Sequence, residues 1–278
     1  MARRISSRHR PILCAVLAGR VFGSDPRTFA ARLFEAGVDW IQLRDRSLGG
    51  QALYALACEL VAAARGQAQQ RLADRRNHET QGLGSRPVQT GPGSEVALDR
   101  DRPRVLINRR VDIALASAAD GVQLGFDAIQ AREARVLLGE SALIGASLHA
   151  LAEVTTAAAA AAAAAKAERA PLGYVQLAPI WNPNSKPASR PALGAAVLAE
   201  ACRAGIPVLA QGGLDESRAE RAIGAGALGI AVTGLLENAA DPIGRAERLR
   251  KALDHAVGPG GKEFRNRLQR SGDTEAAQ

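Results

Sequence analysis

The sequence predicts one α/β domain folded as a single (β/α)8 TIM barrel. Its 278 residues, 47% of them hydrophobic, are enough for one barrel with a sizeable core. Short runs of Val, Ile and Leu alternate with helical stretches, which is typical of a parallel sheet. Eight such strand–helix units follow one another, the number in this barrel. The alternative is an open doubly wound sheet, but that fold typically carries a GxGxxG loop after its first strand, and "VLAGRVFGSD" lacks that spacing.

The first two units occupy the N-terminal part of the chain. A first strand is expected over 11–18. The next helix lies in "DPRTFAARLFEAG", where Asp25 is a suitable N-cap and Pro26 takes the first helical position. The second strand is expected over 38–45, and an Ala/Leu-rich helix follows from about residue 50 to about residue 65.

The N-terminus imitates a secretory signal, because "MARRISSRHR" is basic and "PILCAVLAG" is apolar. That apolar part is about as short as such a region can be, and the count of eight units requires it as the first strand. We therefore expect a strand here. Cys14, Cys58 and Cys202 have neither disulfide nor metal-site spacing, and three free thiols suit a reducing cytoplasm.

The six remaining strands are short apolar runs, each followed by a helical stretch. In chain order they are "RVLIN", "GVQLG", "ALIGASLH", "GYVQLAPIW", "IPVLAQGG" and "LGIAVTG". The last helix is expected over 241–257. The alanine-rich stretch 155–170 is low in complexity, but alanine is the best helix former, so an outer helix accounts for it.

Two stretches do not fit the repeating units. Residues 74–104 are rich in Arg, Gly, Pro, Gln and Ser without periodicity, which indicates a disordered insertion between the second helix and the third strand. Residues 258–278 form a polar, charged tail that we expect to be loose. The barrel itself is therefore expected over 11–257.

The net charge of +8 has two interpretations. Nucleic acid is one, but the arginines are scattered and only 3% of residues are aromatic, so little is present for base stacking. The favoured interpretation is a barrel whose positive field attracts small phosphorylated substrates. No apolar run approaches the roughly 20 residues of a membrane helix, so neither nucleic acid nor membrane is an expected partner. A homo-oligomer stays open.

The active site of such a barrel lies at the C-terminal ends of its strands. Gly212 and Gly213 follow the seventh strand, and Thr233 and Gly234 follow the eighth. Glycine backbone lets N–H groups approach an anion, and a helix N-terminus adds its dipole, so these positions predict a phosphate site.

A second anion site is predicted across the mouth of the barrel. Arg44 and Arg46 are expected on one face of the second strand, because side chains alternate with a period of two, and together they would clamp a larger anion. Ser185 and Lys186 add a hydroxyl and an ammonium on a loop rich in Pro and Asn. The competing interpretation of the paired arginines is a solvated surface.

Six motifs give the chain a family resemblance. "IQLRDR", "LINRRVDIALASAADGVQLG", "IGASLH", "APIWNPNSK", "VLAQGGL" and "GIAVTG" come in the same order as in the thiamine phosphate synthase/TenI family, which the chain resembles over 11–257 apart from the insertion. The resemblance implies a TIM barrel that handles thiazole phosphate in thiamine biosynthesis. In the synthases, hydroxymethylpyrimidine diphosphate loses diphosphate, and the thiazole nitrogen captures the resulting pyrimidine-methyl cation.

The resemblance also implies roles for individual residues. Arg46 stands where many synthases carry Lys. The positions matching those that hold the pyrimidine diphosphate are Gln42, Arg44, Arg46, Asn108 and Ser147, with Lys186 from the hydroxyl–lysine pair. The positions assigned to the thiazole phosphate pocket are Ser185, Gly212, Gly213, Thr233 and Gly234.

The chain departs from the synthases at the expected magnesium ligands. Arg109 replaces an aspartate, and Ala128 stands where a second one belongs, with Asp127 one residue early. Magnesium prefers carboxylate oxygens in near-octahedral geometry, so one displaced carboxylate beside an arginine is a poor site. Asp127 is then the one candidate ligand, and Arg109 is expected to supply positive charge to the diphosphate instead.

Two functions follow from the resemblance. The leading one is a thiamine phosphate synthase-like transferase. The alternative is a TenI-like protein, a tautomerase or regulatory module, that binds thiazole or thiamine phosphate without synthase activity. "NRRVDIAL" is closer to TenI-like proteins, yet tautomerases carry a histidine where this chain has Pro179. His149 is a spare acid/base candidate, although a lone histidine at a strand end is more often structural.

Overall fold

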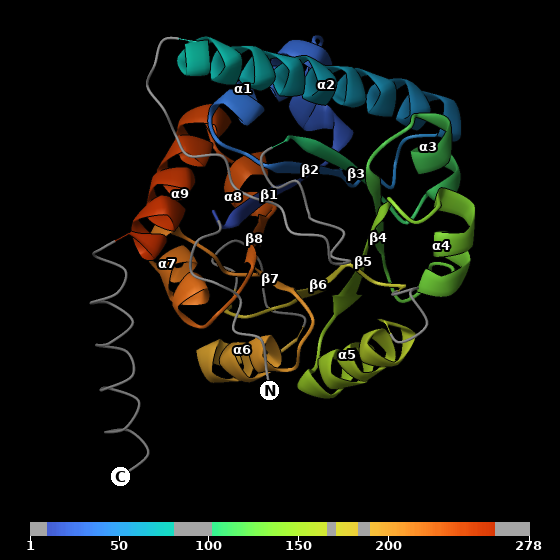
Figure 1. Cartoon of the computed structure of the whole chain (residues 1–278), viewed down its shortest axis with the longest axis vertical. Coiled ribbons are helices and arrows are strands. Elements are labelled where there is room, and N and C mark those ends of the chain that lie inside the picture. The colour runs from blue at the N-terminus through green and yellow to red at the C-terminus, as the bar shows by residue number, and fades with distance from the viewer. Residues whose placement is uncertain (1–9, 81–101, 166–170, 183–189, 259–278) are drawn as a thin grey trace.

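A computed structural model describes residues 10–80, 102–165, 171–182 and 190–258. Eight parallel strands form a closed barrel in chain order, with β8 pairing with β1, and helices surround it (Figure 1). The predicted TIM barrel is confirmed. The strands are β1 (Ile12–Leu17), β2 (Trp40–Leu43), β3 (Arg104–Asn108), β4 (Gly121–Leu124), β5 (Leu143–Leu148), β6 (Tyr174–Leu177), β7 (Val208–Gln211) and β8 (Gly229–Val232).

The helices lie outside the barrel, and short turns or loops join them to the strands (Figure 1). The Asp25 carboxylate caps the first helix by accepting a hydrogen bond from the Thr28 N–H, as the sequence predicts. The helical elements are η1 (Gly19–Phe22), α1 (Pro26–Glu35), α2 (Gly50–Thr80), α3 (Val111–Ala116), α4 (Ala131–Leu138), α5 (Leu151–Ala165), α6 (Gly194–Arg203), α7 (Glu216–Gly224), α8 (Gly234–Glu237) and α9 (Pro242–Val257).

Alternation along the strands creates two apolar layers. One set of side chains packs between the strands and the helices, and includes Leu13, Ile41 and Val105. The other set fills the barrel, where the rings of Trp40 and Tyr174 meet edge to face at 5.1 Å between centroids. The barrel is therefore a packed core rather than a pore, and ligands must bind at its end.

Helix α2 corrects the expected boundaries of the insertion. The helix was expected to stop near residue 65, but it continues to Thr80 and so includes the first part of 74–104. Two bonds tie the extension to α1: Gln67 donates to Glu35 at 2.8 Å and Arg71 donates to the Phe34 carbonyl at 3.0 Å. Lack of apolar periodicity misled the prediction, because the residues there are good helix formers.

The far end of the expected insertion also needs correction, since Arg104 already belongs to β3 and is buried. Of the stretch between Thr80 and Arg104, residues 81–101 lie outside the described residues. So does the tail beyond Gly258.

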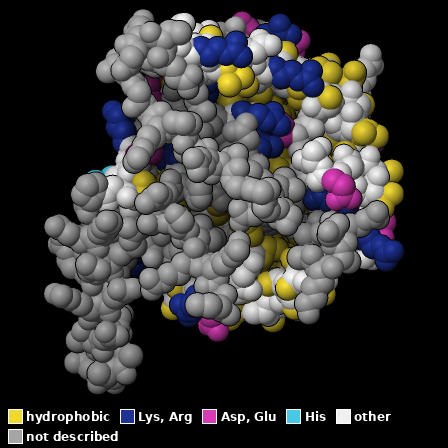
Figure 2. All heavy atoms as spheres, in the orientation of Figure 1, with side chains coloured by type: hydrophobic (Ala, Val, Ile, Leu, Met, Phe, Trp, Pro, Cys, Tyr) yellow, Lys and Arg dark blue, Asp and Glu magenta, His cyan; other side chains and the backbone are white. Residues whose placement is uncertain are grey.

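The outer surface carries one apolar region. Of the seven large hydrophobic side chains that are exposed in the described ranges, five lie on α3, on α4 or in the loop before α4. Figure 2 shows apolar side chains gathered along this edge of the molecule. The five are Leu115, Phe126, Ile129, Val136 and Leu137. None of the helices in the described ranges is long and apolar enough to cross a membrane.

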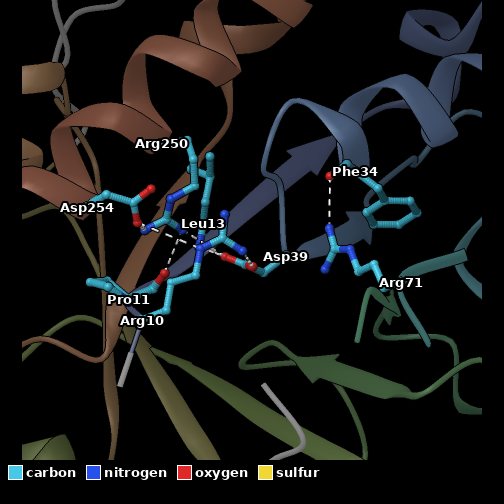
Figure 3. A network of polar contacts seen from close by, with 8 residues as sticks. All are labelled: Arg10, Pro11, Leu13, Phe34, Asp39, Arg71, Arg250 and Asp254. Carbon is cyan, nitrogen blue, oxygen red and sulfur yellow. Dashed lines mark hydrogen bonds and ion pairs between the residues drawn. The ribbon is translucent and has the colours of Figure 1, made fainter. Parts of the chain in front are cut away.

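A buried ion-pair network closes the amino end of the barrel (Figure 3). The Asp39 carboxylate accepts hydrogen bonds from the Leu13 N–H at 2.8 Å and from Arg10 and Arg250 at 3.1 Å each. Arg250, on α9, also donates to the Pro11 carbonyl at 2.8 Å. The network joins α9 to the segments that lead into β1 and β2.

Candidate active site at the carboxyl end of the barrel

A layer of polar side chains lies above the apolar interior at the carboxyl end. Each member follows an inward-facing residue by two positions, as the period of a strand requires. Trp40 is followed by Gln42, for example, and Tyr174 by Gln176. The members are Gln42, Asn108, Gln123, Ser147, Gln176, Gln211 and Thr233.

One hydrogen-bonded chain in this layer crosses the barrel. The Gln176 Nε2 donates to Gln42 Oε1 at 2.7 Å, and the Gln42 Nε2 donates to Asn108 Oδ1 at 2.9 Å. Gln42 and Gln176 are buried, and Asn108 is half-buried at the end of β3. The chain fixes both site residues that the sequence proposed here, Gln42 and Asn108.

Two shorter bonds complete the layer. The Gln123 Nε2 donates to the Ser147 Oγ at 3.0 Å. The Gln211 Nε2 donates to the Thr233 Oγ1 at 3.3 Å. The structure thus brings Ser147 and Thr233, both proposed from the sequence, into the same layer as Asn108, although each is held by a different glutamine.

Arg44 and Arg46 lie in the loop after β2, and both are exposed. The strand ends at Leu43, so the argument that alternation puts them on one strand face is wrong. Their positions are fixed instead by the residue between them. The Asp45 carboxylate accepts bonds from the N–H groups of Gly19 at 2.8 Å, Ser47 at 2.7 Å and Leu48 at 3.1 Å, and from the Ser47 hydroxyl at 2.7 Å.

The electrostatics of Asp45 follow from these bonds. Desolvation raises its pKa, but the hydrogen bonds outweigh that effect and lower the pKa to about 2. Asp45 is therefore a carboxylate that ties the loop carrying the two arginines to the loop after β1. The sequence holds only a weak signal for Asp45, an acidic residue between two basic ones at a strand end.

Arg109 adopts a left-handed backbone conformation, with a φ of 66°. Few residues other than glycine do so, and such conformations concentrate at functional sites. Its N–H donates to the Gln123 carbonyl at 2.9 Å, and its guanidinium forms an ion pair with Asp127. Both side chains are partly exposed. The arginine and the one candidate metal ligand therefore neutralise each other.

The described residues do not fit a magnesium ion. Other carboxylates around the mouth also have partners: Glu237 accepts from the Ala18 N–H at 2.7 Å, and Glu153 accepts from the His149 N–H at 2.6 Å. Ala128 packs against the apolar layer outside the strands. Within the described ranges, no three His, Cys, Asp or Glu side chains gather as a metal site would require.

The glycines after β7 have a packing role that the sequence did not reveal. Gly212 and Gly213 have φ values of 94° and 61°. A Cβ on Gly212 would lie 2.8 Å from the Pro179 Cα, and one on Gly213 would lie 2.5 Å from the carbonyl oxygens of Trp181 and Asn182. Only glycine lets the loop after β6 pass this closely. That loop leads toward Ser185 and Lys186, which lie outside the described residues.

Thr233 and Gly234 stand at the start of α8, with Thr233 at the N-cap and Gly234 as the first helical residue. His149 lies across the mouth. Its Nδ1 bonds to the Ala178 carbonyl oxygen at 2.7 Å, so that nitrogen is the donor and Nε2 is left as the basic nitrogen. The imidazole thereby bridges the loops after β5 and β6, which is the structural role that the sequence favoured.

Comparison with known proteins gives concordant similarities. The family profile described as thiamine monophosphate synthase matches residues 95–236. A thiamine-phosphate synthase of Chlorobium phaeobacteroides is 33% identical over 245 residues, which cover 88% of this chain and 97% of the relative. One from Anaeromyxobacter dehalogenans is 39% identical over 160 residues, covering 57% of this chain and 68% of the relative.

Among solved structures, thiamine phosphate pyrophosphorylase from Pyrococcus furiosus superimposes with a TM-score of 0.63 at 22% identity, covering 90% of this chain and 98% of that one. At this level of identity the match concerns the fold.

Proposed function

The chain belongs to the thiamine phosphate synthase/TenI family, and from that premise we propose that it joins hydroxymethylpyrimidine diphosphate to thiazole phosphate and releases diphosphate. The observation that carries the proposal is the polar layer at the carboxyl end, in which Asn108, Ser147 and Thr233 are held by glutamines beneath the loop of Arg44 and Arg46. Such a layer suits ligands rich in hydrogen-bond acceptors.

The proposed reaction is a dissociative displacement. The bond between the pyrimidine methylene carbon and the diphosphate oxygen breaks, and diphosphate leaves with the electron pair. The lone pair of the thiazole nitrogen then forms the new carbon–nitrogen bond. The protein's part is to hold both substrates in line and to stabilise the charge on the leaving group. Arg44 and Arg46 supply that positive charge, while Asn108 and Ser147 donate hydrogen bonds.

The second anion goes to the opposite side of the mouth. We assign the thiazole phosphate to Gly212, Gly213, Thr233 and Gly234, with Ser185, and we assign Lys186 to the diphosphate. Support comes from the positive φ values of Gly212 and Gly213 and from the position of Gly234 as the first residue of α8.

We further propose that diphosphate binding in this chain depends only weakly on magnesium. The ion pair of Arg109 with Asp127 occupies the carboxylate that a cation would need. A guanidinium has five N–H donors, so Arg109 retains donors for phosphate oxygens while Asp127 holds it in place.

The same ion pair favours the second candidate function. A TenI-like protein would bind thiazole phosphate or thiamine phosphate at the same glycines but would not catalyse the displacement. Incubation with both substrates, in magnesium and in EDTA, separates the two functions. Formation of thiamine phosphate with equimolar diphosphate supports the synthase. Binding of thiazole phosphate without any product supports the TenI-like role and contradicts the synthase.

We propose that the ligands are small phosphorylated molecules, that nucleic acid is not a partner, and that the protein works in the cytoplasm. Cys14, Cys58 and Cys202 are free thiols, which suits a reducing compartment. Burial raises the pKa of the Cys202 thiol to about 12, so that this thiol is unreactive.

We also propose that the apolar edge of α3 and α4 binds a second copy of this chain. A two-fold interface would pack the same apolar patch of each copy against the other, and so would cover Leu115, Val136 and Leu137 on both. Val136→Glu is expected to convert a dimer into a monomer in light scattering, whereas Leu72→Glu, exposed on α2, is not. A wild-type monomer contradicts this proposal.

A further inference from the structure

The hydrogen bonds of the polar layer all run in one direction. Each bond begins at a glutamine amide nitrogen, and each series of bonds ends at an oxygen of Asn108, Ser147 or Thr233. Gln176 acts through Gln42 on Asn108, Gln123 acts on Ser147, and Gln211 acts on Thr233. The family resemblance assigns no role to Gln123, Gln176 or Gln211.

This direction decides what the mouth offers to a ligand. The Asn108 Oδ1 accepts a hydrogen bond from Gln42, so the Asn108 Nδ2 is the atom available to a ligand. An amide nitrogen can only donate a hydrogen bond. Because the hydroxyls of Ser147 and Thr233 accept from glutamines, their own hydrogens are free to point elsewhere. Accepting one hydrogen bond also polarises a hydroxyl or amide as a donor.

We propose that Gln123, Gln176 and Gln211 are positioning residues that set Asn108, Ser147 and Thr233 as hydrogen-bond donors, and so make the mouth selective for phosphate and diphosphate. The inference rests on the proposed function and deepens it. Donors fixed before the ligand arrives need no reorganisation when it binds, which is the condition under which they stabilise a phosphate charge best.

Gln176 is the decisive member, because it is buried and starts the longest chain. Its Nε2 fixes the orientation of the Gln42 amide, and Gln42 in turn fixes the orientation of the Asn108 amide. An ionised glutamate of the same shape has no N–H, and its carboxylate would face the Gln42 oxygen. The Gln42 amide must then rotate, and the Asn108 amide with it, which presents an oxygen to the diphosphate in place of a donor.

The test is calorimetric titration of inorganic diphosphate into wild-type protein, Gln176→Glu and Gln176→Leu. At about pH 8 both variants are expected to bind about tenfold more weakly, the loss of one well-placed donor. Burial raises the pKa of a carboxyl, so lowering the pH to about 5.5 returns a proton to the glutamate, which then donates to Gln42 again. Affinity relative to wild type should recover in Gln176→Glu and stay low in Gln176→Leu.

Controls separate this effect from general damage. Gln69→Glu, at an exposed position of α2, introduces the same charge outside the polar layer and should follow the wild type at every pH. Gln211→Glu, in a half-buried position, should weaken inorganic phosphate and recover in the same way, which keeps the inference testable if Gln176→Glu does not fold.

Two results overturn the inference in different ways. If the wild type binds diphosphate and the glutamate variants have the same affinity at both pH values, the positioning role of the glutamines is wrong while the proposed function stands. If the wild type binds neither anion, both fail.

Discussion

Arginine–aspartate pairs occur at both ends of the barrel, in opposite settings. At the amino end, Asp39 and Arg250 are 2% and 7% exposed, and both also bond to backbone groups (Figure 3). At the carboxyl end, Arg109 and Asp127 are 30% and 38% exposed, and the arginine has a left-handed backbone. The first pair is built into the fold, whereas the second is placed where a ligand can compete for it. The same chemistry therefore joins elements of the fold at one end, and at the other end it lies in the mouth that we propose binds diphosphate.

The largest effect is expected from breaking the amino-end network. Asp39→Ala removes the buried carboxylate that Arg10 and Arg250 share, and it leaves both arginines with only the more exposed Asp254 as an acidic partner. Breaking a buried pair in this way is expected to cost about 3 kcal/mol of unfolding free energy. The matched variant Asp127→Ala removes a partly exposed partner and should cost about 1 kcal/mol or less. Urea denaturation measures both. Equal losses of unfolding free energy would contradict the view that only the amino-end pair stabilises the fold.

The next effect should appear in binding and leave stability alone. Arg44→Ala removes a charge-assisted contact from the mouth and is expected to cost about 1.5–3 kcal/mol of binding free energy for pyrimidine diphosphate. Thiazole phosphate, assigned to the other side, should lose far less. Arg27→Ala on α1 is the control, because its salt bridge to Glu59 is exposed and joins α1 to α2 outside the ring of strands. Calorimetry that gives equal losses for the two ligands would refute the layout of two anion sites.

A third change tests whether the carboxyl-end pair replaces a metal. Arg109→Asp combined with Ala128→Asp restores carboxylates beside Asp127, so magnesium should then strengthen diphosphate binding about tenfold. Ala128→Asp alone keeps Arg109 and should gain less. The comparison is titration of pyrimidine diphosphate in EDTA and in magnesium. Strong magnesium dependence in the unmutated protein would show that Arg109 does not stand in for the ion.

The sequence predicted the strands better than the site. Short, nearly continuous apolar runs identify β1 to β8, because strands that are buried on both faces are apolar at most positions. The helix after β2 was cut short because α2 beyond residue 65 is polar, and polar helix formers give no amphipathic signal. Gln42 and Asn108 came from strand-end positions and the resemblance, and the structure places them in one hydrogen-bonded chain.

The sequence does not predict which side chains form hydrogen bonds or ion pairs with one another. Gln176 and Gln211 follow inward-facing residues by two positions, a signal that could have found them, but the bond from Gln176 to Gln42 spans 134 residues and depends on closure of the barrel. The ion pair of Arg109 with Asp127 likewise depends on how two loops bend after β3 and β4. A Gly-Gly pair in a sequence predicts only a turn. It does not predict that the loop after β6 packs against Gly213.

The smallest effect is expected at β2, which links the two ends of the barrel. A carboxylate at each end of β2 accepts a hydrogen bond from the backbone of β1 or of the loop that follows it. Asp39 accepts from the Leu13 N–H and Asp45 from the Gly19 N–H.

The pKa of Asp45 is lowered to about 2, below its value in the unfolded chain of about 3.9. Its stabilising bonds are therefore fully present above about pH 4 and are lost as the pH falls toward 2. Asp45 is half-buried at the edge of the barrel mouth, and solvent screening there limits the contribution to about 1 kcal/mol. Between about pH 5 and pH 2.5, the wild type should thus lose slightly more unfolding free energy than Asp45→Asn, which has no carboxylate to titrate. Identical pH dependence of the two proteins in urea denaturation would mean that the Asp45 bonds shape the arginine loop without contributing to the stability of the barrel.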